Sequence, residues 1–538
     1  MPRSPQTEQH ASTLLASPRP ESTVLTGFVS AESRTAIQEN VYTVLGHGSF
    51  QRRVLFTGML SSAVLVMHAL AYELISREVP HWCAPPDNLR YLPPEEWRNA
   101  AIPLLADGSY SQCTVYEPPV PVSPEEERRL VTCDRWFYGT DHLEDSIVSR
   151  WDMVCDRDWL HSLSRITYLL GAMLFVPLVG LVSDRVGRRP TILANVVVLL
   201  VCSIGAAASQ TLGMFLVTRF FVSACSCSVQ VLVFILIYEV TGNDRRGLFG
   251  VVATAVGTTV MPPLVYALAL QEPHWYLAHA FLILPTIMLA LWGYFLEESP
   301  SWLIATWRIR AAEQVILLAA SQNRSDMNKA RSTFKVLKDQ VKKREQVALS
   351  TVVSSTDDYF GSATQRCRTL SVMIAWFSAN FIYYGLLLRD VVATELWHAF
   401  LVAVQCLLYT GVWHVLQGLG ERRTLSFLHL VLCISSAAQT FVLLVGWSPM
   451  FPLVDVLVTS LASVVLSLNY IYTAEVFPIV VRSRGLGLSF TVGRIGVLAA
   501  WVLLHVFDSR IPRALQCGGH AVGPAQCCGN TVAAGSIC

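Results

Sequence analysis

The amino-acid sequence predicts an all-α polytopic membrane protein built from two bundles of membrane-spanning helices. The chain of 538 residues is 53% hydrophobic and 15% charged, whereas soluble proteins carry about 25% charged residues. Apolar runs of about twenty residues, the length that crosses the hydrocarbon core, recur along the chain. A charged motif at the end of one of these apolar runs recurs in the second half of the chain. The net charge of +1 indicates nothing about partners, because in a membrane protein the distribution of charge matters more than its sum.

The apolar runs divide the chain into a tail, two bundles, a linker and a second tail. Residues 1–53 form the N-terminal tail, and its first 40 residues are polar, without the apolar segment of a signal peptide. We expect them to be a disordered cytosolic tail. The N-terminal bundle is predicted over 54–296, the linker over 297–368 and the C-terminal bundle over 369–507. We expect eleven spans, near residues 54–75, 160–183, 190–208, 212–240, 247–270, 276–296, 370–388, 392–416, 424–446, 451–473 and 485–507.

Basic residues fall in every second connection between the runs, which sets the orientation by the positive-inside rule. The short connections at 209–210, 271–275 and 447–449 carry almost no charge, and Arg389 and Asp390 after the seventh run are the one mild exception. The N-terminus is therefore predicted to be cytosolic and the long loop 76–158 extracellular. The basic connections are those with Arg185, Arg188 and Arg189; Arg245 and Arg246; the 297–368 linker; Arg422 and Arg423; and Arg482 and Arg484.

The outer loop holds four cysteines, for which we expect two disulfides in an oxidising compartment, with three possible connectivities. A metal site is the alternative, but no CxxC spacing or histidine cluster favours it. The sequon at Asn323 lies in the linker on the predicted cytosolic side, so it should carry no glycan. The cysteines of the loop are Cys83, Cys113, Cys133 and Cys155.

Two charged motifs repeat in the two halves of the chain. "SDRVGRRP" (183–190) corresponds to "LQGLGERRT" (416–424), and "YEVTGNDRRG" (238–247) corresponds to "AEVFPIVVRSRG" (474–485). Gly187 precedes Glu239 by 52 residues, and Gly420 precedes Glu475 by 55. Parallel repeats of this kind indicate the two bundles of a major facilitator transporter, with the substrate site near the midplane between them.

The charges in these motifs lie at the inner ends of helices, where pairs of opposite sign can form a gate. Asp184 can pair with nearby arginines and accept from the N-terminus of a neighbouring helix. Glu239 with Arg245 or Arg246, and Glu475 with Arg482 or Arg484, are the pairs expected within each half. The alternative is that the arginines only anchor helix ends at headgroups, but anchoring requires no acidic partners. The predicted gating residues are Asp184, Arg185, Arg188, Arg189, Glu239, Arg246, Glu475 and Arg482.

Five signatures in order resemble the organic ion transporter family of the major facilitator superfamily, which comprises organic cation, organic anion and carnitine transporters. They are "WDMVCD" (151–156), "SDRVGRR", "LEESPSWLI" (296–304), "WFSANFIYYGLLL" (376–388) and "YTAEVFPIVVRSRGLG" (472–487), and the resemblance covers most of residues 40–507. It implies a fold of twelve helices in two six-helix bundles, alternating access, and transport of small organic ions across the plasma membrane.

The chain departs from the family pattern at several positions. The outer loop lacks the usual glycosylation sequons, Ser301 stands where the family has Arg, and "QCLLY" (405–409) lacks an acidic residue. Gln417 and Gly418 weaken the second copy of the opening motif. After Phe507 the sequence (508–538) contains no twelfth span and resembles an altered reading frame or splice end. Its cysteines, Cys517, Cys527, Cys528 and Cys538, have no metal-binding spacing.

Arg494 lies inside the eleventh run, where a charge costs at least about 2.5–3.5 kcal/mol and therefore indicates function. The resemblance implies a substrate contact here, since many anion and carnitine transporters of the family carry Arg at this position and the best-known cation transporters carry Asp. A guanidinium binds a carboxylate through two hydrogen bonds. The alternatives are an internal pair with Glu475 and an arginine that extends to the membrane interface.

Three more side chains are candidates for substrate binding. Tyr383 and Tyr384 resemble the family's substrate-contacting tyrosines, and their rings can stack on an organic ion. His68, midway along the first run, could face the cavity and titrate near neutral pH. Packing inside a bundle is the alternative for all three. Trp376 is predicted to pack, and Arg219 to brace helices.

The sequence therefore predicts a secondary-active or facilitative transporter of small organic ions, with anions or zwitterions favoured. Cation transport is the alternative within the family, and a non-transporting or truncated membrane protein is the alternative outside it. A sugar carrier is disfavoured by the large cysteine-bearing loop. The chain contains no GxxxxGK[ST] loop, and we expect no enzyme activity, no cofactor, no metal and no nucleic-acid partner.

Overall fold

The computed structural model describes residues 42, 45–77, 79–105, 108–119, 128–139, 146–271, 274–348, 363–387, 395–445 and 450–508. The N-terminal tail before residue 42 and the sequence after residue 508 lie outside the described residues, as do Arg389 and Asp390. The expectations about those segments therefore stay predictions.

Each of the eleven predicted apolar runs overlaps a helix in the described residues, so the predicted all-α membrane fold is confirmed. Ten helices in the described ranges are long and apolar enough to cross a membrane, and α9 holds the shorter apolar segment Leu277–Gly293. The helices of the first half are α2 (Ser49–Ile75), α5 (Trp159–Val186), α6 (Arg188–Ala207), α7 (Leu212–Val240), α8 (Asn243–Ala269) and α9 (Trp275–Gly293). Those of the second half are α14 (Ala363–Leu387), α15 (Glu395–Leu419), α16 (Glu421–Val445), α17 (Phe451–Val476) and α18 (Arg482–Asp508).

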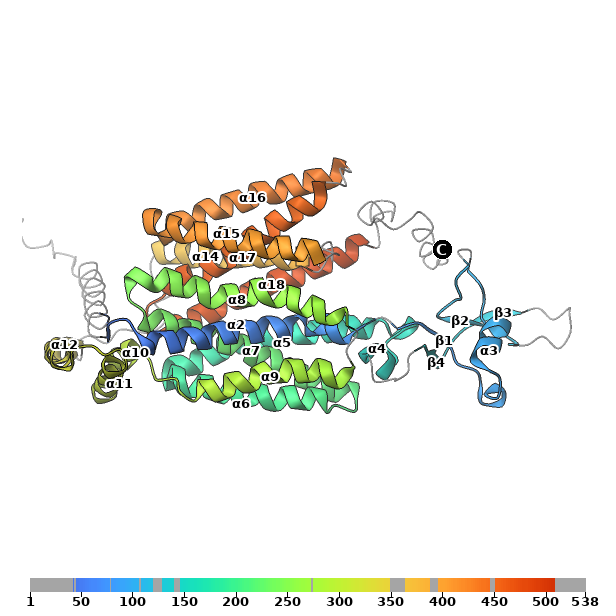
Figure 1. Cartoon of the computed structure of the whole chain (residues 1–538), viewed down its shortest axis with the longest axis horizontal. Helices are drawn as coiled ribbons and strands as arrows, with labels where there is room; N and C mark the ends of the chain where they lie inside the picture. The colour runs from blue at the N-terminus through green and yellow to red at the C-terminus, as the bar shows by residue number, and fades with distance from the viewer. Residues whose placement is uncertain are drawn as a thin grey trace, which may run out of the picture.

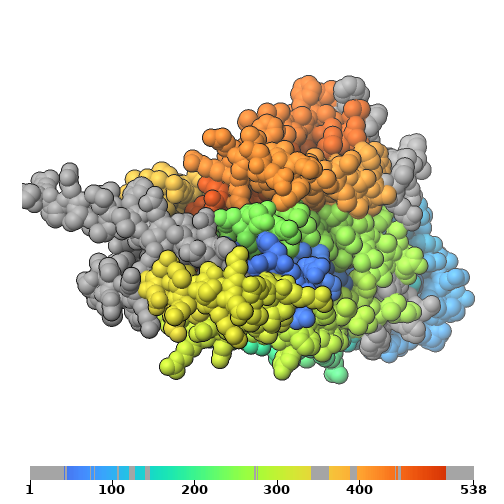
Figure 2. Space-filling view, turned by 60° about the vertical axis from the view of Figure 1, so that its left-hand side comes forward, coloured from blue at the N-terminus to red at the C-terminus, as the bar shows by residue number. Residues whose placement is uncertain are grey.

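The helices of each half lie together, and the two halves pack against each other along their length (Figure 1). Helix α18 contacts α5 and α7, and α8 contacts α15 and α17. A buried core continues across this interface, where the ring of Phe234 lies 5.0 Å from that of Tyr470. Figure 2 shows the C-terminal half, in orange, as a distinct mass on the green and blue helices of the first half.

Two smaller structures lie beyond opposite ends of the helices (Figure 1). At one end, β1 (His81–Cys83) pairs antiparallel with β4 (Trp136–Tyr138), and β2 (Thr114–Glu117) pairs antiparallel with β3 (Arg129–Thr132). The short helices α3 (Pro94–Ala101) and α4 (Ile147–Arg150) belong to the same loop. At the other end lie the linker helices α10 (Pro300–Ala305), α11 (Ile309–Gln322) and α12 (Met327–Ala348).

The four cysteines of the outer loop form two disulfides, which selects one of the three connectivities left open by the sequence. Cys83 pairs with Cys133 and Cys113 pairs with Cys155, with Cα–Cα distances of 5.4 and 5.6 Å. His81 lies within 4.8 Å of the Cys113 and Cys155 sulfurs, but both sulfurs are already bonded to each other. The disulfides therefore account for these cysteines.

The backbones of helices α5 and α18, which belong to opposite halves, approach each other closely at two glycines. A Cβ on Gly180 would lie 2.5 Å from the carbonyl oxygen of Ser483, and a Cβ on Gly487 would lie 3.0 Å from that of Val176. Only a residue without a side chain permits backbones to approach this closely. The contact brings Asp184, one turn beyond Gly180, to the first turn of α18.

Candidate functional site

At the end of the helices next to the linker, which the sequence predicts to be the inner end, five charged residues form what we term the inner charge cluster: Asp184, Arg188, Glu239, Arg482 and Arg484. Its centre is the Arg188–Glu239 pair, in which both side chains have 0% exposure. The guanidinium donates from Nε to Oε2 at 3.2 Å and from Nη2 to Oε1 at 3.1 Å. Two parallel charge-assisted bonds of this kind fix orientation as well as contributing energy.

The cluster joins the two halves of the chain. Arg482, the first residue of α18, donates from Nη1 to Oε1 of Glu239 at 3.3 Å. Arg188 in turn donates from Nη2 to the carbonyl oxygen of Ile479, at 2.8 Å. The contacts therefore link the two halves at the end next to the linker. Removing one partner of such a buried pair leaves an uncompensated charge, at a cost of about 3–5 kcal/mol.

Asp184 lies at the N-terminus of α18, which is the kind of position that the sequence predicted. Its carboxylate accepts from the backbone N–H groups of Ser483 at 3.2 Å and Arg484 at 3.0 Å. It also lies 3.4 Å from Arg188 and from the Nε of Arg484. A carboxylate is stabilised there by the free N–H groups and the dipole of the helix.

The expected pairings of Glu239 and Glu475 within each half are wrong. Glu239 pairs with Arg188 and Arg482, whereas Arg246 stacks on Tyr238 at 4.3 Å. Glu475 is exposed and forms no ion pair among the described residues. The reason is that α7 ends at Val240 and α8 begins at Asn243, so the seven-residue spacing crosses a bend and defines no common helix face.

The two other arginines of the opening motif lie at the edge of the cluster. Arg185 is exposed, and Arg189 lies 3.5 Å from Glu297. These positions suit contact with water or headgroups. Of the three arginines in that motif, Arg188 is the one that belongs to the inner charge cluster.

Sequence reasoning missed Glu298, which caps helix α6. Its carboxylate accepts from the backbone N–H groups of Arg188 at 2.9 Å, Arg189 at 3.2 Å and Ser299 at 2.9 Å. Burial raises the pKa of Glu298, while those hydrogen bonds and the charge of Arg188 act in the opposite direction. The signal was present in the signature "LEESPSWLI" (296–304), where Glu298 stands directly before Ser299 and Pro300.

Helix α10 of the linker packs into the same region. The Trp302 indole has 0% exposure, donates to the carbonyl oxygen of Asp184 at 3.2 Å, and lies under the Arg188 guanidinium at 5.3 Å. The hydroxyl of Ser301 donates to the carbonyl oxygen of Glu239 at 3.1 Å. The linker therefore supports both sides of the Arg188–Glu239 pair.

The centre of the molecule holds a second candidate site around Arg494 on α18. This guanidinium has only 3% exposure, and its carbon lies 5.2 Å from the ring centre of Tyr384 and 4.6 Å from that of Phe490. Nη2 contacts the sulfur of Cys227 at 3.8 Å. No carboxylate pairs with Arg494 in the part of the chain that the structure describes, so the predicted alternative of an internal pair with Glu475 is not seen.

The other candidate residues for substrate binding differ in position. Tyr384 lies at Arg494, whereas Tyr383 is buried in the core between the halves. His68 is buried at the contact with α9, where Nε2 lies 3.1 Å from the hydroxyl of Thr286. This contact favours the packing interpretation of His68. Trp376 is also buried and donates to the Thr473 hydroxyl at 2.8 Å.

Arg219 stacks on aromatic rings of the N-terminal half. Its guanidinium carbon lies 4.9 Å from the ring centre of Tyr168, 5.4 Å from that of Tyr72 and 5.8 Å from that of Phe215. These contacts agree with the predicted bracing of helices.

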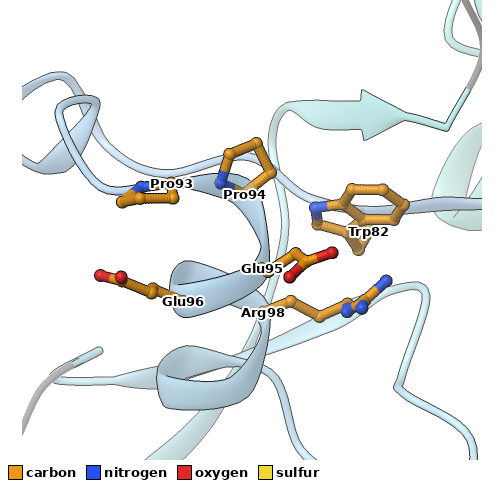
Figure 3. Close-up of a pocket in the computed structure, with 6 residues that line it drawn as sticks. All are labelled: Trp82, Pro93, Pro94, Glu95, Glu96 and Arg98. Carbon is orange, nitrogen blue, oxygen red and sulfur yellow. The ribbon is translucent and has the colours of Figure 1, made fainter.

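A surface hollow of about 450 Å³ lies in the outer loop, away from both sites (Figure 3). Arg98 lies over the ring of Trp82 at 5.5 Å along one wall. The hollow is lined by Trp82, Pro93, Pro94, Glu95, Glu96 and Arg98. We assign it no role.

Comparison with known proteins places the chain among membrane transporters. A family model described as "Sugar (and other) transporter" matches residues 138–514. "Solute carrier family 22 member 7" of Rattus norvegicus is 27% identical over 478 residues, which cover 85% of this chain and 87% of that protein. "Organic cation transporter protein" of Drosophila melanogaster is 28% identical, with 87% and 86% covered. "Organic cation/carnitine transporter 2" of Rattus norvegicus is 28% identical, with 89% and 88% covered.

A solved structure shows the same fold. The structure of the major facilitator superfamily proton:xylose symporter XylE matches with a TM-score of 0.57 and 13% identity, covering 88% of this chain and 94% of that one. At this identity the likeness concerns the fold alone. Since the family model spans more than half of the chain, and the relatives are those that the sequence signatures resemble, this multi-pass membrane protein belongs to the sugar (and other) transporter family and has the major facilitator fold.

Proposed function

We propose that the protein carries small organic ions across the plasma membrane by alternating access, with anions or zwitterions preferred over cations. Two relatives are named as transporters of organic cations, one of them also of carnitine. Their names support organic ions as the substrate class. The preferred sign of the substrate charge is inferred from the central site around Arg494.

The preference for anions rests on one observation, the burial of Arg494 without a carboxylate partner. A buried charge is stable only when it is paired and hydrogen-bonded. A substrate carboxylate would supply that partner through the planar guanidinium fork. The half-buried ring of Tyr384 beside it offers a face for an apolar or aromatic substrate body.

Cation transport is the alternative, and the same geometry argues against it. Rings attract cations through their faces, but the guanidinium of Arg494 already lies over Tyr384 and Phe490. A second cation at these rings would meet the charge of Arg494. Cation transport would therefore need a site elsewhere.

Alternating access is supported by the position of the inner charge cluster. It bridges the two halves at one end of the helices, so opening a path to that side requires these pairs to separate. The disulfide-bonded loop and the linker lie at opposite ends (Figure 1), which supports the proposed orientation with the N-terminus in the cytosol.

Uptake into cells that produce the full chain tests this function. Radiolabelled salicylate, carnitine and tetraethylammonium represent an anion, a zwitterion and a cation, and untransfected cells give the background. We expect uptake of the first two above the third. Uptake of tetraethylammonium alone would replace the anion proposal by cation transport, and uptake of none of them would favour a non-transporting protein.

A further inference from the structure

The thiol of Cys227 lies at the centre of the molecule, in contact with the guanidinium of Arg494. The sulfur is 3.8 Å from Nη2, and the two residues have 0% and 3% exposure. Cys227 belongs to α7 and Arg494 to α18, so the contact crosses the interface between the halves. The inner charge cluster makes no use of this thiol.

A polar group beside the thiol lacks a hydrogen-bond partner. Among the described residues, Nε of Arg494 has none, although the side chain is only 3% exposed. The large majority of buried polar side-chain atoms in proteins are hydrogen-bonded. An unsatisfied guanidinium N–H beside the thiol therefore indicates a place where an anionic group binds.

We propose that Cys227 is a thiol-modification site within this central site, and that it takes small anionic thiol reagents in preference to cationic ones. The proposal rests on the proposed function in one respect, since the halves must part for a reagent to reach the thiol. The thiolate is the reactive form of cysteine, and it is favoured beside a cation and disfavoured in apolar surroundings. When the site is open, water replaces the apolar surroundings, and the positive charge of Arg494 still favours the thiolate.

The reaction with a methanethiosulfonate is balanced without any other reactant. The thiol of Cys227 loses its proton to water, and the thiolate sulfur attacks the sulfenyl sulfur of the reagent. The S–S bond of the reagent breaks, and methanesulfinate leaves with the electron pair. A mixed disulfide between Cys227 and the reagent remains, which blocks the space beside Arg494.

Cys225 provides a matched control on the same helix. It has 5% exposure and packs in the core within the N-terminal half, beside Val222 and Val229. Cys227 belongs to the core shared by both halves. A reagent that enters between the halves should therefore reach Cys227 and not Cys225.

The experiment compares two reagents on cells that carry the full-length protein. They are the anionic 2-sulfonatoethyl methanethiosulfonate and the cationic 2-(trimethylammonio)ethyl methanethiosulfonate, and mass spectrometry measures the labelled fraction of Cys227. We expect the anionic reagent to label Cys227 at least about tenfold faster than the cationic one. A cleft lined by charges of one sign raises the local concentration of counter-ions by about 10- to 1,000-fold. Arg494→Gln should remove this preference, and salicylate should slow the labelling.

Uptake measurements give an independent readout. Inhibition of salicylate uptake by the anionic reagent should be lost in Cys227→Ser and kept in Cys225→Ser. The inference is overturned if Cys227 stays unlabelled during turnover, or if both reagents label it at equal rates. Preferential labelling without protection by salicylate would instead contradict the anion proposal while supporting the thiol site. Salicylate uptake without labelling of Cys227 would overturn the thiol site alone.

Discussion

Arg482, at the start of α18, donates to the carboxylate of Glu239, near the end of α7, at 3.3 Å across the interface between the two halves. The same carboxylate accepts two hydrogen bonds from Arg188 of its own half. One buried anion is therefore shared by cations from both halves. Any motion that separates the inner ends of the halves must leave Glu239 with fewer partners.

A double-mutant cycle on Arg482 and Glu239 measures this contact. We expect Arg482→Ala and Glu239→Gln to be coupled by about 1.5–3 kcal/mol in thermal or denaturant unfolding of the purified protein. This is the upper part of the range of about 0.5–3 kcal/mol for residues in contact, because the pair is buried. Arg245 and Asp244 form an exposed pair at 3.6 Å, with side-chain exposures of 56% and 66%, and serve as the control. Their coupling should stay below about 1 kcal/mol, and equal coupling of the two pairs would contradict a special role for Glu239.

Asp184→Asn should lower uptake per surface molecule by about tenfold, since charge-assisted hydrogen bonds contribute about 1.5–3 kcal/mol each. The asparagine oxygen can still accept from one backbone N–H group of α18, but the charge opposite Arg188 and Arg484 is lost. Radiolabelled uptake divided by surface biotinylation measures the effect. Unchanged uptake per surface molecule would refute the gating role of Asp184.

The helices and the cysteine-bearing loop could be predicted from the sequence, because hydropathy, loop charge and cysteine counts are local signals. The position of Asp184 could also be predicted, since an acidic residue at a helix end favours the N-terminus of a neighbouring helix. The partners of Glu239 could not be predicted. They depend on how α7, α6 and α18 meet in space, and a spacing of seven residues across a bend carries no such information.

The central site shows the same limit. Arg494 could be identified because a charge inside an apolar run is unusual, and Tyr384 because it resembles a family tyrosine. Neither signal distinguishes Tyr384 from Tyr383, whose ring is buried in the core. Cys227 carries no charge and lies in an apolar run, so only the packing of α7 against α18 shows its contact with Arg494.

Glu298 should make transport sensitive to pH on the side of the linker. Burial raises the pKa of this carboxyl in the closed arrangement, and opening would return the pKa towards the ordinary value. The closed form therefore binds a proton more tightly, so acid favours closure and the effect is lost as the pH rises above the raised pKa. We expect uptake to slow when the solution on the side of the linker is acidified. The part of this slowing that is due to Glu298 should be absent in Glu298→Gln. Proteoliposomes with a clamped internal pH measure this, and equal pH profiles of the two proteins would contradict it.

Asn323 should carry no glycan, because its side-chain amide is part of the packing between the linker and α2. Its Oδ1 accepts from the backbone N–H of Phe50 at 3.0 Å, and its Nδ2 donates to the carbonyl oxygen of Leu45 at 2.8 Å and to Oε1 of Gln51 at 2.9 Å. We expect no glycosidase-sensitive shift in electrophoretic mobility. A shift in the wild-type protein that Asn323→Gln abolishes would overturn both the packing and the proposed orientation.

Substitutions of Arg494 should decide the charge preference of transport. Arg494→Lys keeps the charge and loses the fork, so the apparent affinity for salicylate should fall about tenfold, at the lower end of the 1.5–3 kcal/mol that a charge-assisted bond contributes. Arg494→Asp should abolish uptake of salicylate and open the rings of Tyr384 and Phe490 to a cation such as tetraethylammonium. Arg219→Lys controls for the loss of a buried arginine that stacks on Tyr168, and it should lower the amount of folded protein at the surface without changing the ratio of salicylate to tetraethylammonium uptake. If Arg494→Ala leaves that ratio unchanged, Arg494 is structural and the preference for anions is refuted.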